Sequence, residues 1–275
     1  MANKSPAYPI DLAPEGDTKR QLIVTWQNID TRAIEPIGLL TNAGDEFRFE
    51  YFESAKSVLG FRPFPGFKDF DHVYTAEELF PLFSSRVLSS TRPDYQEYVE
   101  KLDLQVSDAT PWELLTRSEG KTAGDTIQLF PVPRRRGQEL ELDVLIAGSR
   151  HMTKKKVIPE GAAPVGNYPP EDFESLLSEI SPGDQLSLVR ETDNNAGRAY
   201  ARLVLKDTVD PIGYLPDWIA KEFEQHIDKG EVSLTVTRVN PAQAGWHLRI
   251  LGNLRVHTDA SDLFRGEQWM SAYAA

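Results

Sequence analysis

The sequence predicts an α+β protein in which a small antiparallel sheet with helices is followed by a mostly β-stranded second half. Three observations lead to this fold class. Apolar and polar residues alternate, as in half-buried strands, between Gln21 and Tyr51 and again between Leu142 and Leu254. Short helical patterns are concentrated between Ala76 and Ser118. The length of 275 residues exceeds the usual size of one domain and favours two.

The first half is expected to contain a small sheet. Gln21–Trp26 is rich in strand-forming residues, and Ile37–Leu40 is the next candidate strand. In Phe47–Tyr51 aromatic residues alternate with charged ones, which is typical of a strand with one buried face. Asp125–Val132 closes this half as a further strand.

Helical patterns follow at Ala76–Ser84, Pro93–Leu102 and Pro111–Ser118. The second and third begin with Pro in the first turn, where the missing N–H does no harm. Between the sheet and these helices, Gly60–Phe70 is too dense in Pro and Gly for regular structure, yet its aromatic side chains would be costly to leave in water. This segment is expected to wrap over the sheet.

The second half is expected to be rich in strands. Six are predicted, at Leu142–Arg150, Gln185–Arg190, Ala199–Lys206, Pro211–Leu215, Val232–Val239 and Trp246–Leu254. One helix is predicted from Pro216 to about Lys229, because apolar residues recur there at helical spacing and Gly230 supplies a stop. A long loop at Thr153–Pro170 precedes a short helix at Glu171–Glu179.

The predicted domain boundaries follow from these patterns. The proline-rich segment around Pro131 and Pro133, with the triplet Arg134–Arg136, marks a linker or domain edge. The chain is therefore divided into a flexible tail at 1–18, an α+β domain at 19–138, a β-rich domain at 139–258 and a C-terminal tail at 259–275.

Composition excludes several classes of function. The absence of Cys removes disulfides, thiol catalysis, iron–sulfur clusters and the usual structural zinc sites. The N-terminal segment has no apolar region behind a basic start, and no run is long enough to span a bilayer. A cytoplasmic protein without membrane contact is expected. The net charge of −12 argues against a protein that coats DNA, so any contact with nucleic acid must be local.

Catalytic motifs are not found. Glu119–Thr122 ends like a phosphate-binding loop, but Leu115 stands where that loop needs its first Gly. The five histidines lie far apart in the sequence, and no Gly-x-Ser-x-Gly presents a nucleophile. We expect no enzyme activity, no cofactor, no metal site and no catalytic residue; an enzyme with no recognised motif is the alternative.

The order of elements in the second half resembles a known family. Leu186–Asn195, Ala199–Lys206 and Ile212–Pro216 read as a strand, a polar turn, a second strand, and a short strand leading directly into a helix. This order resembles the HIRAN domain, a small β-barrel module found alone in bacteria and attached to helicase-like transcription factors in eukaryotes. Upstream, Val144–Met152 looks like the family's opening strand, whose Gly-x-Arg-aromatic end lies beside the nucleic-acid groove. The resemblance implies a six-stranded OB/SH3-like β-barrel with one or two helices, which binds single-stranded DNA or DNA ends.

The resemblance also implies a binding site. Arg150, His151 and Met152 match positions where the family has an Arg and two aromatic residues, and a basic cluster follows directly. Asp193 and Asn194 fall in the family's polar turn. The predicted nucleic-acid-binding set is Arg150, His151, Met152, Lys154, Lys155, Asp193, Asn194, Arg198 and Tyr214.

Each part of this set has a simpler interpretation. The triplets Arg134–Arg136 and Lys154–Lys156 could be solvated loops, although both flank the strand that carries Arg150. Asp193–Asn194 could be a turn that bonds its own backbone, and Tyr214 could cover the following helix. The family's turn also has an Asp that helps to hold a free 3′ end, and Gly197 replaces it here. Arg198 could contact phosphate instead, which would favour binding of the backbone.

The first half shows a second, shorter resemblance. Val24–Asn28, Pro36–Leu40, Phe47–Tyr51 and Leu79–Phe83 are similar to the N-terminal subdomain of HipA-like serine/threonine kinases of toxin–antitoxin systems. In that family this subdomain lacks the active site, and the kinase body is missing here. The resemblance implies an accessory domain, or an antitoxin-like subunit that restrains a separate HipA-like kinase. Any α+β domain with a Gly at a strand bend is the alternative.

Overall fold

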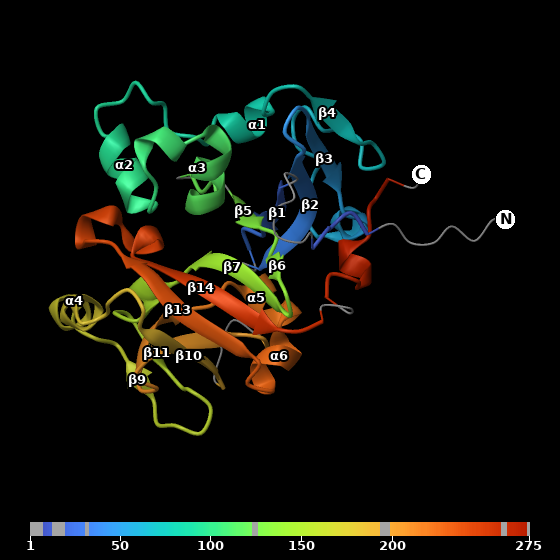
Figure 1. Ribbon diagram of the computed structural model, residues 1–275. Helices are drawn as coiled ribbons and strands as arrows, with labels where there is room; N and C mark the ends of the chain where they lie inside the picture. Colours follow the sequence, from blue (N-terminus) through green and yellow to red (C-terminus); the bar gives the residue numbers. More distant parts are fainter. Residues whose placement is uncertain are drawn as a thin grey trace. The chain divides into compact units, whose positions relative to one another are not determined.

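The computed structural model describes residues 8–12, 20–30, 33–122, 126–192, 199–259 and 263–273. The chain divides into two compact units (Figure 1). The first unit comprises Met1–Gly137 together with Ala260–Ala275, and the second comprises Gln138–Asp259.

The first unit contains an antiparallel five-stranded sheet in the order β4-β3-β2-β1-β5. Its strands are β1 (Arg20–Gln27), β2 (Ile34–Asn42), β3 (Phe47–Tyr51), β4 (Tyr74–Ala76) and β5 (Ile127–Pro131). The central pairing places Leu22 opposite Leu40, and both side chains are buried. The small N-terminal sheet expected from the sequence is therefore present, with β4 as an addition.

The helical segments of the first unit are short. They are η1 (Glu53–Ser57), α1 (Pro81–Ser84), α2 (Tyr95–Lys101), η2 (Val106–Asp108), α3 (Pro111–Ser118) and η6 (Glu267–Trp269). Helix α3 has the predicted bounds, and the Thr110 side chain accepts a hydrogen bond from the Glu113 N–H at its start. The helix predicted at Ala76–Ser84 is reduced to its last four residues, since Ala76 ends β4 and Pro81 begins α1.

Aromatic side chains form the core of the first unit. The Pro- and Gly-rich segment from Gly60 to Phe70 folds over the sheet as expected and buries Phe64 and Phe67. The hydroxyl of Tyr51 donates to the carbonyl of Phe67 at 2.9 Å and accepts from the N–H of Phe64 at 2.8 Å. This buried hydroxyl therefore fixes the irregular segment to strand β3.

Two segments predicted as tails are packed against the first unit. At the C-terminal end, Phe264 and Trp269 are buried, and the N–H of Ala272 donates to the carbonyl of Tyr51. At the N-terminal end, Ile10 is buried and the Gln21 side chain donates to the carbonyl of Pro9. Residues 8–12 and 263–273 thus contact the rest of the first unit, whereas the sequence analysis expected a flexible tail at 1–18 and a C-terminal tail at 259–275; the other residues of these segments lie outside the described ranges, apart from Asp259.

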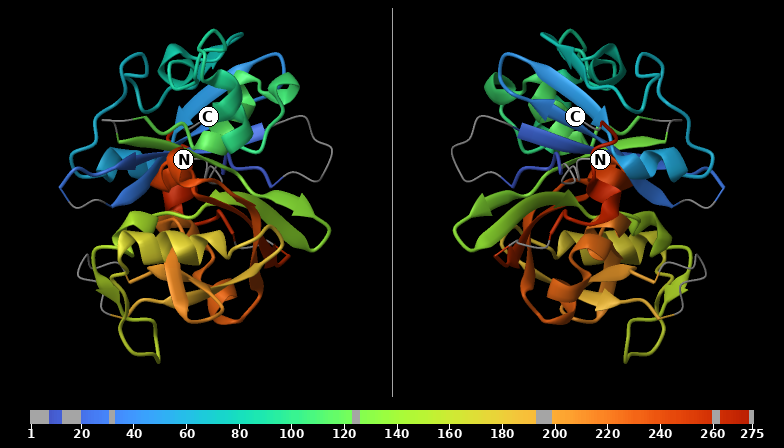
Figure 2. Two further views of the ribbon diagram at one scale, coloured as in Figure 1. Left: turned by 90° about the vertical axis from the view of Figure 1, so that its left-hand side faces the viewer. Right: turned by 90° about the vertical axis from the view of Figure 1, so that its right-hand side faces the viewer.

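The second unit is built on a seven-stranded sheet in the order β12-β11-β10-β13-β14-β7-β6, and the pairings from β12 to β7 are antiparallel (Figure 2). The strands of this sheet are β7 (Glu139–Leu145), β10 (Gln185–Arg190), β11 (Arg202–Lys206), β12 (Asp210–Tyr214), β13 (Val232–Val239) and β14 (Ile250–His257), together with β6 (Arg134–Arg136), which falls in the first unit. Two short strands, β8 (Lys156–Val157) and β9 (Val165–Gly166), pair separately. The triplet Arg134–Arg136, expected in a linker, is thus an edge strand that immediately precedes the boundary between the units.

The closed six-stranded barrel is not confirmed. The strand order is open, with β12 and β6 at its edges. One isolated bridge, between Ala147 and Tyr214, joins the residues just beyond β7 to β12, with N···O distances of 2.9 and 2.8 Å. The predicted strand Leu142–Arg150 ends earlier than expected because Gly148 turns the chain with a φ of 67°.

The helical segments of the second unit are η3 (Ser149–His151), α4 (Pro170–Ser178), α5 (Asp217–Glu222), α6 (Glu224–Asp228), η4 (Ala242–Ala244) and η5 (Trp246–Leu248). The single helix predicted from Pro216 to about Lys229 is divided at the buried Phe223 into α5 and α6. Likewise, the strand predicted to begin at Trp246 begins at Ile250, because η5 occupies the preceding residues. In the part of the chain that is described, no helix has the length and apolar character needed to cross a membrane.

Candidate nucleic-acid interface

After the end of strand β7, the chain forms a turn that carries several cationic side chains. We call residues 148–156 the basic turn. It begins at Gly148, where a side-chain carbon would stand only 3.0 Å from the ring of Tyr214. Gly148 also has a left-handed backbone conformation, so both the turn and the close approach of the ring require glycine here.

Arg150 is exposed on this turn. Its guanidinium forms no hydrogen bond or ion pair with any residue in the described part of the chain. Lys154 and Lys156 are exposed as well. These three cations are therefore available to an anionic ligand, whereas cations already held in ion pairs would have to break them first.

Lys155 is partly engaged. Its ammonium lies 3.7 Å from a carboxylate oxygen of Glu191 and 5.9 Å from the centre of the Tyr214 ring. The Tyr214 hydroxyl donates to the same oxygen of Glu191 at 3.1 Å. Glu191 therefore holds Lys155 and Tyr214 next to each other, at the end of β10.

The Glu191 carboxylate is buried, with a side-chain exposed fraction of 1%. Among the residues that the structure describes, its second oxygen, Oε2, has no hydrogen-bond partner. A buried carboxylate oxygen without a donor is costly, and such groups are usually satisfied. Glu191 is a residue that the sequence analysis missed: it lies inside the segment that resembles the family, but its burial depends on strands that are distant in sequence.

Tyr214 and His151 both approach the basic turn. Each has a ring carbon within 3.3 Å of the position that a Gly148 side-chain carbon would take, and both side chains are half-buried. Tyr214 therefore lies over Gly148 and beside the basic turn, with part of its ring accessible. A partly exposed ring among cations is the combination that binds unpaired bases and their phosphates.

Met152 does not belong to this surface. Its side chain is fully buried, with an exposed fraction of 0%. Its backbone carbonyl accepts from the N–H of Tyr168, which holds the basic turn in place. The expectation that Met152 packs against a base is therefore corrected: this side chain belongs to the core beneath the turn.

The predicted residues Asp193, Asn194 and Arg198 lie outside the described residues, as does Gly197. Of the predicted set, the structure thus brings together Arg150, His151, Lys154, Lys155 and Tyr214 around one turn and its neighbouring strand end.

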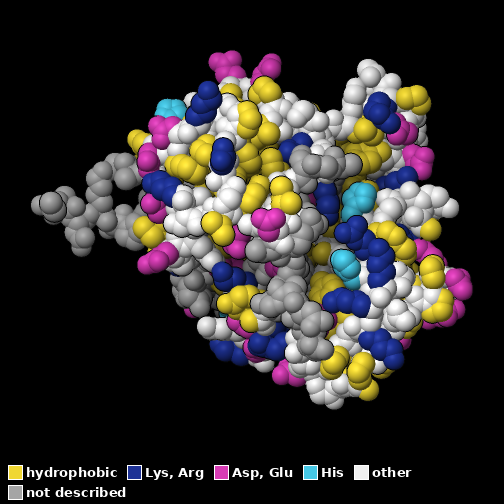
Figure 3. Space-filling view, turned by 180° about the vertical axis from the view of Figure 1, so that it is seen from behind, with side chains coloured by type: hydrophobic (Ala, Val, Ile, Leu, Met, Phe, Trp, Pro, Cys, Tyr) yellow, Lys and Arg dark blue, Asp and Glu magenta, His cyan; other side chains and the backbone are white. Residues whose placement is uncertain are grey.

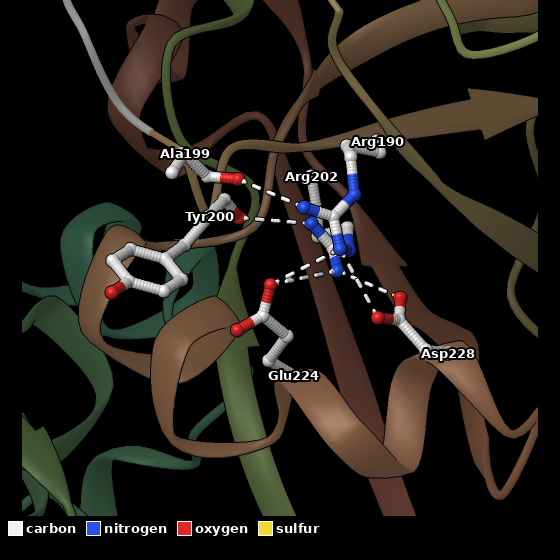
Figure 4. Close-up of polar contacts among 6 residues, drawn as sticks. All are labelled: Arg190, Ala199, Tyr200, Arg202, Glu224 and Asp228. Atoms are coloured by element: carbon white, nitrogen blue, oxygen red, sulfur yellow. Dashed lines mark hydrogen bonds and ion pairs between the residues drawn. The ribbon is translucent and has the colours of Figure 1, made fainter.

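A cluster of two arginines and two carboxylates lies beyond the ends of β10 and β11 (Figure 4). Arg190 contacts Glu224 and Asp228, each at 3.1 Å. Arg202 contacts Asp228 at 2.8 Å and Glu224 at 3.6 Å. We call these four residues the arginine clamp, because they tie two strands to helix α6.

Arg202 is the buried member of the arginine clamp, with a side-chain exposed fraction of 1%. The sequence analysis did not single it out. The signal available was an Arg inside an otherwise apolar strand, together with two carboxylates four residues apart, Glu224 and Asp228, on the predicted helix.

The surface carries basic groups locally despite the acidic net charge. Figure 3 shows Lys and Arg side chains gathered around two histidines on one part of the surface. Nowhere in the described ranges do three His, Asp or Glu side chains cluster as a metal ion would need. The local chemistry favours contact with an anion.

Comparison with known families matches residues 143–259 to the HIRAN domain. This match supports the resemblance of the second half to that family. Neither the curated proteins nor the solved structures gave a match. The HipA-like resemblance of the first half gains no support from any of these comparisons.

Proposed function

We propose that the HIRAN unit binds single-stranded DNA, or the single-stranded ends of DNA, through the basic turn. The observation that carries this proposal is the exposed Arg150, which has no ion-pair partner among the described residues, next to the half-buried ring of Tyr214. The proposed role is binding without a chemical step or cofactor, in the cytoplasm.

Charge and ring geometry support this function together. Arg150, Lys154 and Lys156 offer cations to phosphates, while Tyr214 and His151 offer flat groups to bases. Because the whole chain carries a charge of −12, attraction must come from this local group, and binding will weaken steeply with salt. The carboxylate of Glu191 accepts a hydrogen bond from the Tyr214 hydroxyl and so keeps the Tyr214 ring in place.

The mode of binding follows from a difference from the family pattern. Gly197 stands where the family has the Asp that helps to hold a 3′ end. Arg198 adds a cation close by in the sequence. We therefore propose contact with the backbone of the strand in preference to recognition of its terminal hydroxyl.

The proposal is tested by fluorescence anisotropy with a short labelled single-stranded oligonucleotide over a series of salt concentrations. The double variant Arg150→Gln, Lys154→Gln should bind more weakly and lower the slope of log K against log salt by about 1.4, the value for two lost phosphate contacts on a single strand. If the natural protein shows no binding at low salt, the proposal is wrong.

Lys229→Gln is the matched control. Lys229 is exposed and precedes strand β13. The first residue of β13 lies opposite Val256 of β14, and Val256 lies opposite Leu140 at the start of β7. The basic turn follows the other end of β7. The control variant removes one positive charge at the opposite end of the sheet and should leave the salt slope unchanged.

A further inference from the structure

A second aromatic residue is exposed in the HIRAN unit. Tyr200 has an exposed fraction of 38%, and the ammonium of Lys221 in helix α5 lies 5.7 Å from the centre of its ring. Lys221 is exposed too. A ring and an ammonium at this distance attract each other, so the side chains form one aromatic and cationic pair on the surface.

The backbone at Tyr200 is held by two hydrogen bonds from arginine side chains. The guanidinium of Arg202 donates to the carbonyl of Tyr200 at 3.4 Å, and that of Arg190 donates to the carbonyl of Ala199 at 3.3 Å. Figure 4 shows both donors pointing at successive carbonyls, while the Tyr200 ring points away from the arginine clamp. The clamp therefore fixes where Tyr200 stands without occupying its ring.

Tyr200 is also close to the candidate interface along the chain. The carbonyl of its neighbour Ala201 accepts from the N–H of Glu191, the residue whose carboxylate holds Tyr214. Three residues after Tyr200, Leu203 lies opposite Tyr214 in the sheet. Three residues of extended chain span about 10 Å, so the backbone at Tyr200 lies within the length of a few nucleotides of the backbone at Tyr214.

We propose that Tyr200 and Lys221 form a second stacking subsite, in which the Tyr200 ring takes a base of the bound strand and Lys221 takes a neighbouring phosphate. This inference rests on the proposed function. A ring that stacks on bases works with every base, because each base has a flat face. The subsite therefore adds affinity without adding sequence preference.

The test compares the natural protein with Tyr200→Ala and Tyr200→Phe, using a single-stranded oligonucleotide of about ten nucleotides, within the range that one small β-domain covers. Loss of the ring should weaken binding about tenfold, since stacking on an aromatic residue contributes 5- to 150-fold per base. Tyr200→Phe keeps a flat ring and should bind as the natural protein does.

Val209→Ala is the matched control, because Val209 is an exposed apolar residue of the same unit, on the turn between β11 and β12. It should leave affinity unchanged. A fluorescent base analogue in the oligonucleotide supplies a second readout: its quenching on binding should be reduced in Tyr200→Ala and retained in Tyr200→Phe.

The outcomes separate the two proposals. If the natural protein binds and Tyr200→Ala binds and quenches equally well, the second subsite is overturned while the proposed function stands. If the natural protein does not bind the oligonucleotide at low salt, both are overturned. Thermal unfolding of each variant shows whether a loss of affinity is a loss of fold.

Discussion

The two units differ in the proportion of aromatic and charged side chains that they bury, although the first also buries Glu50. In the first unit, the Phe49 ring contacts Tyr51, Phe64, Phe67 and Phe83, with ring centres 4.7 to 6.4 Å apart. Such contacts combine burial of large apolar area with favourable edge-to-face geometry. The first unit is therefore held together mainly by aromatic packing.

The second unit encloses charged groups. Arg202, Arg249 and Glu191 are at most 5% exposed, and each has an oppositely charged neighbour. Buried ion pairs add little net stability, because removing charges from water costs about as much as the pair regains. What they provide here is fixed position: Glu191 holds Tyr214, and Arg202 holds the backbone of Tyr200. In the second unit, which carries the candidate interface, buried charged side chains therefore hold groups of the surface in position.

The largest expected effect is on the aromatic core. Phe49→Ala should lower the free energy of unfolding of the first unit by about 4 kcal/mol, since it removes a fully buried ring and leaves a cavity. Chemical denaturation followed by tryptophan fluorescence measures this loss. Phe49→Leu should lose less, because it retains part of the volume. A loss below about 1 kcal/mol would show that the rings do not dominate the stability of this unit.

The next effect is on the arginine clamp. Arg202→Ala should lower the free energy of unfolding of the second unit by about 2 kcal/mol, because it leaves Glu224 and Asp228 sharing only Arg190. The loss is smaller than for a fully buried pair since Asp228 is half exposed and water screens it.

Arg92→Ala is the control for this change. Arg92 pairs with Asp94 in the first unit, but both side chains are more than half exposed. An exposed pair contributes little, so the denaturation midpoint should not move. Equal midpoint shifts for Arg92→Ala and Arg202→Ala would show that enclosed and exposed ion pairs contribute equally to stability.

The smallest expected effect is the loss of stability of the two units at alkaline pH. Burial raises the pKa of Tyr51 in the first unit, and burial together with the hydrogen bond to Asp210 raises the pKa of Tyr168 in the second. The unfolded chain loses these protons first, at its ordinary pKa near 10. Stability is therefore complete below about pH 10 and declines as pH rises toward the folded-state values.

Denaturation midpoints measured at pH 9 and pH 11 test this expectation. Tyr51→Phe should reduce the alkaline loss in the first unit by about 1 kcal/mol at pH 11. Tyr168→Phe should do the same for the second unit, to a smaller extent, because Tyr168 is only half-buried. An unchanged pH dependence in both variants would mean that other groups control it.

Local signals were sufficient for several elements of the fold. Strand β3 and helix α3 have the bounds expected from the sequence, because alternation defines the first and the Thr110 cap with Pro111 defines the second. The Gly-x-Arg motif was predicted as the end of a strand, whereas the chain turns at Gly148 and exposes Arg150.

Other features depend on contacts between distant parts of the chain. Arg202 and Asp228 are 26 residues apart, so the ion pair between them depends on tertiary structure, and the position of Arg202 in a largely apolar strand is the local signal of its burial. Met152 takes a motif position where the family exposes an aromatic residue, yet here it points into the core. Sequence pattern therefore indicates which residues share a turn, and the tertiary packing decides which of their side chains reach solvent.

The C-terminal residues belong to the first unit, and this determines how the two units are connected in the sequence. The second unit is an insertion, since the chain returns to the first unit after it. Its entry and exit lie side by side: Glu139 pairs with His257, and the N–H of Thr258 donates to the carbonyl of Gln138. Such a segment behaves as a cassette, which a few linking residues could replace while its host stays intact.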